Sequence, residues 1–86
     1  MESYKIIKHP LSTEKSIRLM ESDNKLVFVV DEKAGKKEIK KAIEEMFNVN
    51  VDHVRTFNTS KGEKRAYVKF SAKNPAIDIA TQLGLM

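Results

Sequence analysis

Residues 36–48 read KKEIKKAIEEMFN and give the clearest structural signal in the chain. The apolar side chains of this stretch recur at i, i+3, i+4, i+7 and i+8, which is the spacing of a helix that buries one face. These side chains are Ile39, Ala42, Ile43, Met46 and Phe47. The segment therefore predicts an amphipathic helix packed on a core, with Gly35 in the N-cap position.

Strand-like segments flank this helix on both sides. Residues 26–30, LVFVV, are apolar throughout, which indicates a central strand buried on both faces. Residues 51–59 follow the helix, and a break in their alternation near His53 predicts a β-bulge. A crossover through the helix should join the two strands with a right-handed connection.

A hairpin is predicted after the second of these strands. Residues 60–63 form its turn, in which Gly62 can take a positive φ, and residues 64–70 form the return strand. If the return strand lies beside residues 26–30, the sheet becomes a split βαβ arrangement.

The N-terminal part predicts a short strand and a short helix. The strand covers residues 4–7 and is ended by Pro10. Ser12 or Thr13 can cap the helix, which runs to about residue 21 with Thr13, Ile17 and Met20 on one stripe.

The C-terminal part predicts one more helix. Asn74 is expected to cap it, Pro75 to take the first helical position, and Gly84 to end it. Its apolar stripe consists of Ala76, Ile79, Ala80 and Leu83. Residues 1–86 are thus expected to form a single small α+β domain.

Composition excludes several classes of protein. The chain has 16 Lys and Arg against 12 Asp and Glu. This excess is too small to identify a binding partner, so the positions of the charges must be considered instead. The chain has no cysteine, which excludes a disulfide framework and a thiolate metal site. No segment has the apolar length of a membrane span or of a signal peptide core. We expect a soluble intracellular protein without membrane insertion.

Motifs for catalysis are missing from the sequence. His9 and His53 are far apart and show no metal-ligand spacing, and three glycines are too few for a glycine-rich phosphate loop. Glu44 and Glu45 are neighbours that face different directions on a helix. We expect no enzyme activity, no catalytic residues, no cofactor and no metal.

The central helix carries its charges in reverse. Lys36, Lys37, Lys40 and Lys41 lie in its first half, where carboxylates are preferred. Each misplaced surface charge costs about 0.3–1 kcal/mol. Lysines beside a helix N-terminus can bind phosphate. The alternative is a solvated face in which lysines pair with glutamates four residues later.

The hairpin offers a second cationic surface. Arg65, Tyr67 and Lys69 share one face of the return strand, and Arg55 and Phe57 match them on the preceding strand. Cations interleaved with aromatic rings suit RNA, since phosphates take the cations and bases stack on the rings. The alternative is an aromatic pair under a helix, covered by arginine stems.

An RNA recognition motif is the alternative function. Residues 66–70, AYVKF, partly match its signature strand. However, Lys64 and Arg65 stand where that motif has glycine and an aromatic residue, and the chain offers no final strand. A free-standing module for single-stranded RNA therefore ranks second.

Several blocks resemble one family in order and spacing. They are PLSTEKS at 10–16, NKLVFVV at 24–30, AGKKEIKKAIEEMF at 34–47, VRT at 54–56 and GEKRAYV at 62–68. Together they resemble the twenty-third large-subunit ribosomal protein family, a universal family at the exit of the peptide tunnel. The short turn at 60–63 and the ending AIDIATQLGLM resemble the archaeal and eukaryotic branch. Bacterial members have a long hairpin extension and eukaryotic members a basic N-terminal extension, so an archaeal source is expected.

The resemblance implies a ferredoxin-like fold with a four-stranded, mostly antiparallel sheet and about three helices. It implies a structural role in the cytoplasmic ribosome, binding to large-subunit ribosomal RNA and contact with the neighbouring twenty-ninth large-subunit protein. It further implies a docking surface for the signal recognition particle or other exit-site factors.

Site residues follow from the residue patterns and the resemblance together. The predicted RNA-binding residues are Lys8, His9, Lys15, Lys36, Lys37, Lys40, Arg55, Lys61, Lys64, Arg65, Tyr67 and Lys69. The predicted factor-docking residues are Glu14, Arg18 and Glu21, with an ordinary solvated helix as the alternative. Glu14 matches the glutamate with which bacterial relatives dock a ribosome-bound chaperone. The family usually has Asn where Arg55 stands and a side-chain cap where Gly35 stands.

Overall fold

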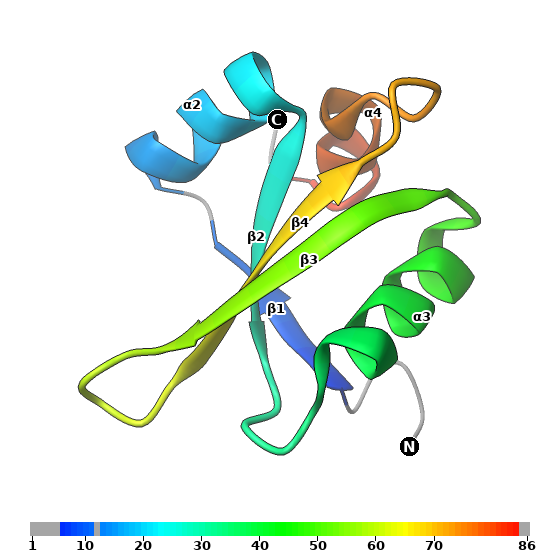
Figure 1. Cartoon of the computed structure of the whole chain (residues 1–86). Helices are drawn as coiled ribbons and strands as arrows, with labels where there is room; N and C mark the ends of the chain where they lie inside the picture. Colours follow the sequence, from blue (N-terminus) through cyan, green and yellow to red (C-terminus); the bar gives the residue numbers. More distant parts are fainter. Residues whose placement is uncertain (1–5, 12, 85–86) are drawn as a thin grey trace.

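The computed structural model describes residues 6–11 and 13–84, and these form an α+β fold built on one sheet (Figure 1). The elements in chain order are β1 (Ile7–Pro10), α2 (Glu14–Asp23), β2 (Lys25–Val30), α3 (Lys36–Phe47), β3 (Val51–Asn58), β4 (Lys64–Phe70) and α4 (Ala76–Gln82). The strand order is β1-β2-β4-β3, with every neighbouring pair antiparallel. Strands β2 and β3 are therefore parallel and separated by β4, which confirms the predicted ferredoxin-like split βαβ arrangement.

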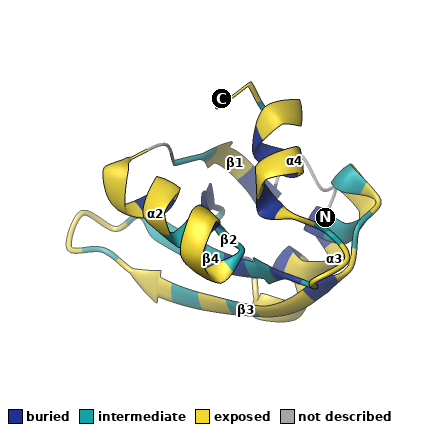
Figure 2. Cartoon of the chain, turned by 90° about the horizontal axis from the view of Figure 1, so that it is seen from above, coloured by how far each residue is buried: buried dark blue, intermediate teal, exposed yellow. Residues whose placement is uncertain are grey.

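The core lies on one face of the sheet. Leu26, Phe28 and Val30 of β2 share it with Ala66, Val68 and Phe70 of β4. Helices α3 and α4 cover this face through Ile39, Ile43 and Ile79, all nearly inaccessible to solvent. In Figure 2 the buried positions of both helices face the sheet, while their outer sides are exposed. Neither of these two helices covers the other face of the sheet.

The stripe of α3 is confirmed at its centre and wrong at one position. Ile39, Ala42 and Ile43 are buried, whereas Met46 is 42% exposed. Phe47 instead closes the stripe, with its ring 6.5 Å from that of Phe28. The sheet thus meets the last helical turn on the Phe47 side, and Met46 is left at the rim.

Helix α2 begins as predicted, but it buries a different side. Thr13 is the N-cap, and its hydroxyl accepts a hydrogen bond from Ser16 N at 3.2 Å. Ser12 lies outside the described residues. Ile17 was expected in the stripe but is 37% exposed, while Ser16 and Met20 are buried. Burial of Ser16 is inexpensive because its hydroxyl donates to Leu11 O at 2.9 Å.

The first strand lies later in the chain than predicted. It covers Ile7–Pro10 rather than residues 4–7, of which 4 and 5 lie outside the described residues. Pro10 is its last residue, and Pro10 pairs with Phe28 at the edge of the sheet. An edge position tolerates proline, which has no N–H to donate.

The cap of α4 was predicted wrongly. Pro75 occupies the N-cap position, and the helix starts at Ala76. The N–H of Ala76 donates to the side-chain oxygen of Asn24 at 2.6 Å. Asn74 is engaged elsewhere, since its Oδ1 accepts from Asn50 N at 2.9 Å. A residue 52 positions away therefore does the capping that the sequence assigned to Asn74.

The hairpin matches its prediction closely. The pairing of β3 with β4 shifts between Val51 and His53, which is the expected bulge. Gly62 takes a φ of 79° in the turn. Arg55 pairs with Tyr67, and Phe57 pairs with Arg65. Within the described parts of the chain, no helix combines the length and apolar character needed to cross a bilayer.

Candidate nucleic-acid interface

The first cationic surface is the exposed flank of α3. Lys36, Lys37 and Lys40 are all exposed there. Glu38 turns back, and its carboxylate accepts the N–H of Gly35 at 3.2 Å. Because Gly35 has no side chain, only this half of a capping box is made.

Glu44 does not neutralise this flank in the way the solvated-face alternative requires for Lys40. Glu44 accepts the N–H of Val51 at 3.1 Å and so serves to start β3. Among the described residues, Lys40 has no ion pair with Glu44. The flank therefore keeps its positive charge available for an anion.

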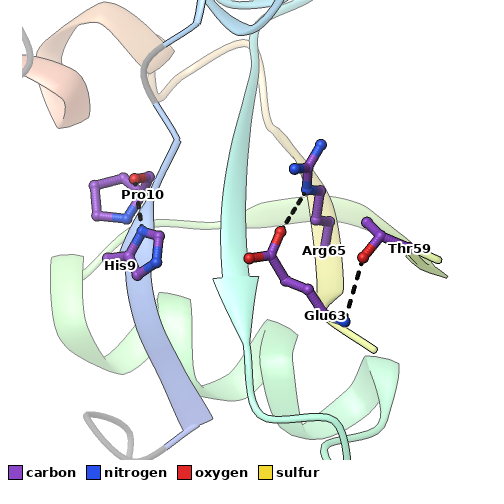
Figure 3. A network of polar contacts seen from close by, with 5 residues as sticks. All are labelled: His9, Pro10, Thr59, Glu63 and Arg65. Carbon is purple, nitrogen blue, oxygen red and sulfur yellow. Dashed lines mark hydrogen bonds and ion pairs between the residues drawn. The ribbon is translucent and has the colours of Figure 1, made fainter. Parts of the chain in front are cut away.

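The hairpin adds cations at one end of the sheet. Lys61 is exposed at the turn, and the Lys64 ammonium donates to Ala34 O, just before α3, at 2.6 Å. Figure 3 shows the turn from close by: Glu63 N donates to the Thr59 hydroxyl, and the Glu63 carboxylate pairs with Arg65 at 2.8 Å. Lys64 thus joins the hairpin to the loop that leads into α3. The charge of Arg65 is partly neutralised by Glu63.

The second cationic surface is the face of the sheet opposite the core, here called the open face. The register places three rows across β2, β4 and β3 on this face. The rows are Val29–Arg65–Phe57, Val27–Tyr67–Arg55 and Lys25–Lys69–His53. The two valines are buried, while Arg55, Phe57 and His53 are exposed. Helices α3 and α4 pack on the other side, so the exposed side chains of this face lie outside the core cluster.

Two aromatic rings form the centre of the open face. The rings of Phe57 and Tyr67 lie 5.2 Å apart with an interplanar angle of 54°, and Phe57 is 41% exposed. A groove of about 300 Å³ runs beside them. Its lining residues are Lys15 of α2 together with Lys25, His53, Arg55, Phe57 and Tyr67. Helix α2 therefore borders the open face beside the two rings.

Like charges stand opposite one another on this face. Lys25 of β2 pairs directly with Lys69 of β4. Directly opposed like charges destabilise a sheet. Within the described parts of the chain, no carboxylate lies within ion-pair distance of Lys15, Lys25 or Arg55. A surface with this excess of cations attracts anions.

The remaining predicted residues lie on β1 and on the outer side of α2. Lys8 and His9 are exposed on β1, where His9 pairs with Val29 and its Nδ1 lies 3.2 Å from Pro10 O (Figure 3). Glu14 and Arg18 form an ion pair at 2.7 Å with both side chains more than three-quarters exposed. Glu21 is exposed one turn further along.

The structure thus separates the predicted residues into groups. Lys15, Arg55, Arg65, Tyr67 and Lys69 come together at the open face. Lys36, Lys37 and Lys40 lie on α3, on the side of the sheet that holds the core, with Lys64 linking the two regions. Sequence reasoning missed Lys25 and His53 as site residues, and it placed Phe57 on this surface without including it among the RNA-binding residues. The alternation Lys25, Val27, Val29 carried the signal, but only its register against β4 shows that Lys25 faces Lys69. No group of metal-ligating side chains is found among the described residues.

Comparison with known proteins agrees with this geometry. The family model of ribosomal protein L23 matches residues 5–81. The large ribosomal subunit protein uL23 of Methanococcus aeolicus is 41% identical over 85 residues, which cover 99% of both chains. That relative is archaeal, in keeping with the branch expected from the short hairpin turn. The chain therefore belongs to the ribosomal protein L23 family.

Proposed function

We propose that this protein is a structural constituent of the large ribosomal subunit and works in the cytoplasmic ribosome by binding large-subunit ribosomal RNA. Family membership supports the ribosomal role over a free-standing RNA module. The observation that carries the RNA contact is the set of exposed cations, on α3 and on the open face, that lack carboxylate partners among the described residues. No catalytic step forms part of this function.

Phosphate binding is assigned to side chains on both sides of the sheet. Lys36, Lys37 and Lys40 contact phosphates beside the first turn of α3, where backbone N–H groups reinforce the attraction. Further phosphate contacts lie on the N-terminal strand, on α2 and on the hairpin. The residues that make them are Lys8, His9, Lys15, Lys61, Lys64 and Arg65. Arg55, Tyr67 and Lys69 contact RNA on the open face. Cations on both sides of the sheet suit a folded RNA, which can contact the protein over several surfaces.

Protein partners are assigned to the outer side of α2. Glu14, Arg18 and Glu21 lie at i, i+4 and i+7, so they share one helix face. Ile17 is exposed beside them, which adds an apolar contact. Exposed ion pairs contribute little to stability, so this surface is available for recognition. We assign it to exit-site factors such as the signal recognition particle. Contact with the twenty-ninth large-subunit protein, near the tunnel exit, completes the assignment.

The α3 assignment is tested by changing Lys36, Lys37 and Lys40 to Gln and measuring affinity for folded large-subunit RNA over a range of salt. Each lost phosphate contact should reduce the log–log salt slope by about 0.7–0.9. Lys73→Gln, an exposed lysine outside both cationic surfaces, is the control and should leave the slope unchanged. An unaltered slope in the triple variant would remove α3 from the interface.

A second comparison separates the ribosomal role from a single-strand module. The wild-type protein should bind folded large-subunit RNA more tightly than short single strands. The reverse preference would favour a free-standing module.

A further inference from the structure

The groove beside Phe57 and Tyr67 has the size and lining of a small binding site. Its volume of about 300 Å³ is at the lower end of the range of roughly 300–1,000 Å³ for ligand pockets. A single nucleotide therefore fits it better than a folded segment of another macromolecule. A smaller hollow of about 160 Å³ shares Lys15, Phe57 and Tyr67 with the groove. Both rings thus line two neighbouring hollows.

The charge of the groove selects an anion. Lys15, Lys25 and Arg55 line it together with His53, and no carboxylate is among its described lining residues. The opposed pair Lys25–Lys69 stands next to Tyr67 on the sheet. A phosphate placed there would relieve the repulsion between the two ammonium groups.

The aromatic rings select a flat partner. Phe57 and Tyr67 are tilted by 54° to each other, so they do not stack face to face on one another. Phe57 is 41% exposed, so part of its ring surface is accessible to a third ring. Unpaired RNA bases stack on such side chains, and their phosphates bind nearby cations.

We propose that this groove holds one unstacked nucleotide of RNA. The base lies against Phe57 and Tyr67, and the flanking phosphates lie at Lys15 and at the Lys25–Lys69 pair. This inference rests on the proposed function and adds to it the kind of RNA element recognised, an extruded nucleotide rather than a continuous duplex.

The test uses the full chain with three probes: a uridine hexamer, a blunt RNA duplex and hexaglutamate. The ring signals of Phe57 and Tyr67 are followed by NMR, and affinity is measured over a range of salt. The double variant Phe57→Leu/Tyr67→Leu removes the rings but keeps apolar side chains. Phe47→Leu removes a ring on the core side and is the control. Phe57→Leu alone, at an exposed position, serves if the double variant does not fold.

The expected result is a shift of both ring signals with the hexamer and a weaker effect with the duplex. The double variant should lose about tenfold in affinity for the hexamer, since stacking is the contact removed. Its salt slope should not change because no phosphate contact is lost. Lys25→Gln/Lys69→Gln should instead lower the slope by about 1.4, from roughly 0.7 for each contact.

Three outcomes would overturn the inference. One is unchanged hexamer affinity in the ring variants, and another is the absence of any ring shift. The third is a shift with hexaglutamate as large as with the hexamer, because that ligand has charge but no base. If wild-type protein binds folded large-subunit RNA in any of these cases, only the nucleotide site is refuted. If it does not bind that RNA, the proposed function fails as well.

Discussion

Asn24 should be among the most sensitive surface-accessible positions of this protein, because it joins three elements. It ends α2 in the left-handed region, with a φ of 57°. Its side-chain amide lies 3.2 Å from each of three carbonyl oxygens, those of Phe70, Ser71 and Asn74. Its side-chain oxygen accepts the first N–H of α4. Replacement therefore loosens α2 from the end of β4 and from α4 together.

The expected losses in unfolding free energy can be separated by two variants. Asn24→Gly keeps the left-handed backbone but removes the side-chain contacts. The three amide contacts are long, at 3.2 Å, and count together as one net hydrogen bond, while the short bond from Ala76 N counts as a second. At about 1 kcal/mol each, the loss is about 2 kcal/mol. Asn24→Ala removes the same contacts and also places an alanine at positive φ, which adds about 1 kcal/mol. The total of about 3 kcal/mol is a large share of the roughly 5–15 kcal/mol that stabilises a small domain.

Urea denaturation followed by circular dichroism measures both variants. Asn48 provides a matched control, since it ends α3 at a φ of 53° and has no side-chain hydrogen bond to the described residues. Asn48→Gly should therefore change stability by less than about 0.5 kcal/mol. If Asn24→Gly is as mild as Asn48→Gly, the side-chain bridge contributes nothing and the reasoning is refuted. If Asn24→Ala equals Asn24→Gly, the backbone part of the estimate is wrong.

Two further predictions concern the hairpin and the open face. Gly62→Ala should lower the free energy of unfolding by about 1 kcal/mol. The φ of 79° is the sole cause, since no atom lies within 4 Å of the added methyl group; an unchanged urea midpoint would contradict it. Lys69→Thr should raise stability by a few tenths of a kcal/mol, because it relieves the repulsion with Lys25 and Thr suits a strand. The same variant should weaken RNA binding. A fall in both the free energy of unfolding and the RNA affinity would show that Lys69 has a structural role.

Local sequence signals were enough to predict most of the fold. The alternation at β4, the apolar run of β2 and the helical spacing around Ile39 each specify one element and its buried side. Together with the turn at Gly62 they predict that β4 pairs with β3, and the pairing of β4 with β2, which the sequence left as a condition, is confirmed. The position of β1 was not predicted. The pairing of Arg55 with Tyr67 follows from the same alternation.

The errors came from positions where distant contacts decide. Ile17 and Met46 have the right spacing for burial, but the sheet does not reach them. Asn74 has the right place for a cap, yet Asn24 supplies the oxygen from the other end of the domain. Lys25 lies just outside the strand predicted at 26–30, but the register of β2 against β4 pairs it with Lys69. Such contacts link residues more than 40 positions apart, and no local pattern records them.

The one-sided core described above has a consequence for how this protein can change over time. Substitutions at Phe57, Arg55 or His53 leave the packing beneath α3 and α4 intact, so recognition can drift without loss of folding. A substitution in the core beneath α3 and α4, by contrast, lowers the stability of the fold. The two faces of the sheet are in this way under separate selection. The core face is selected for stability, and the open face is selected for binding.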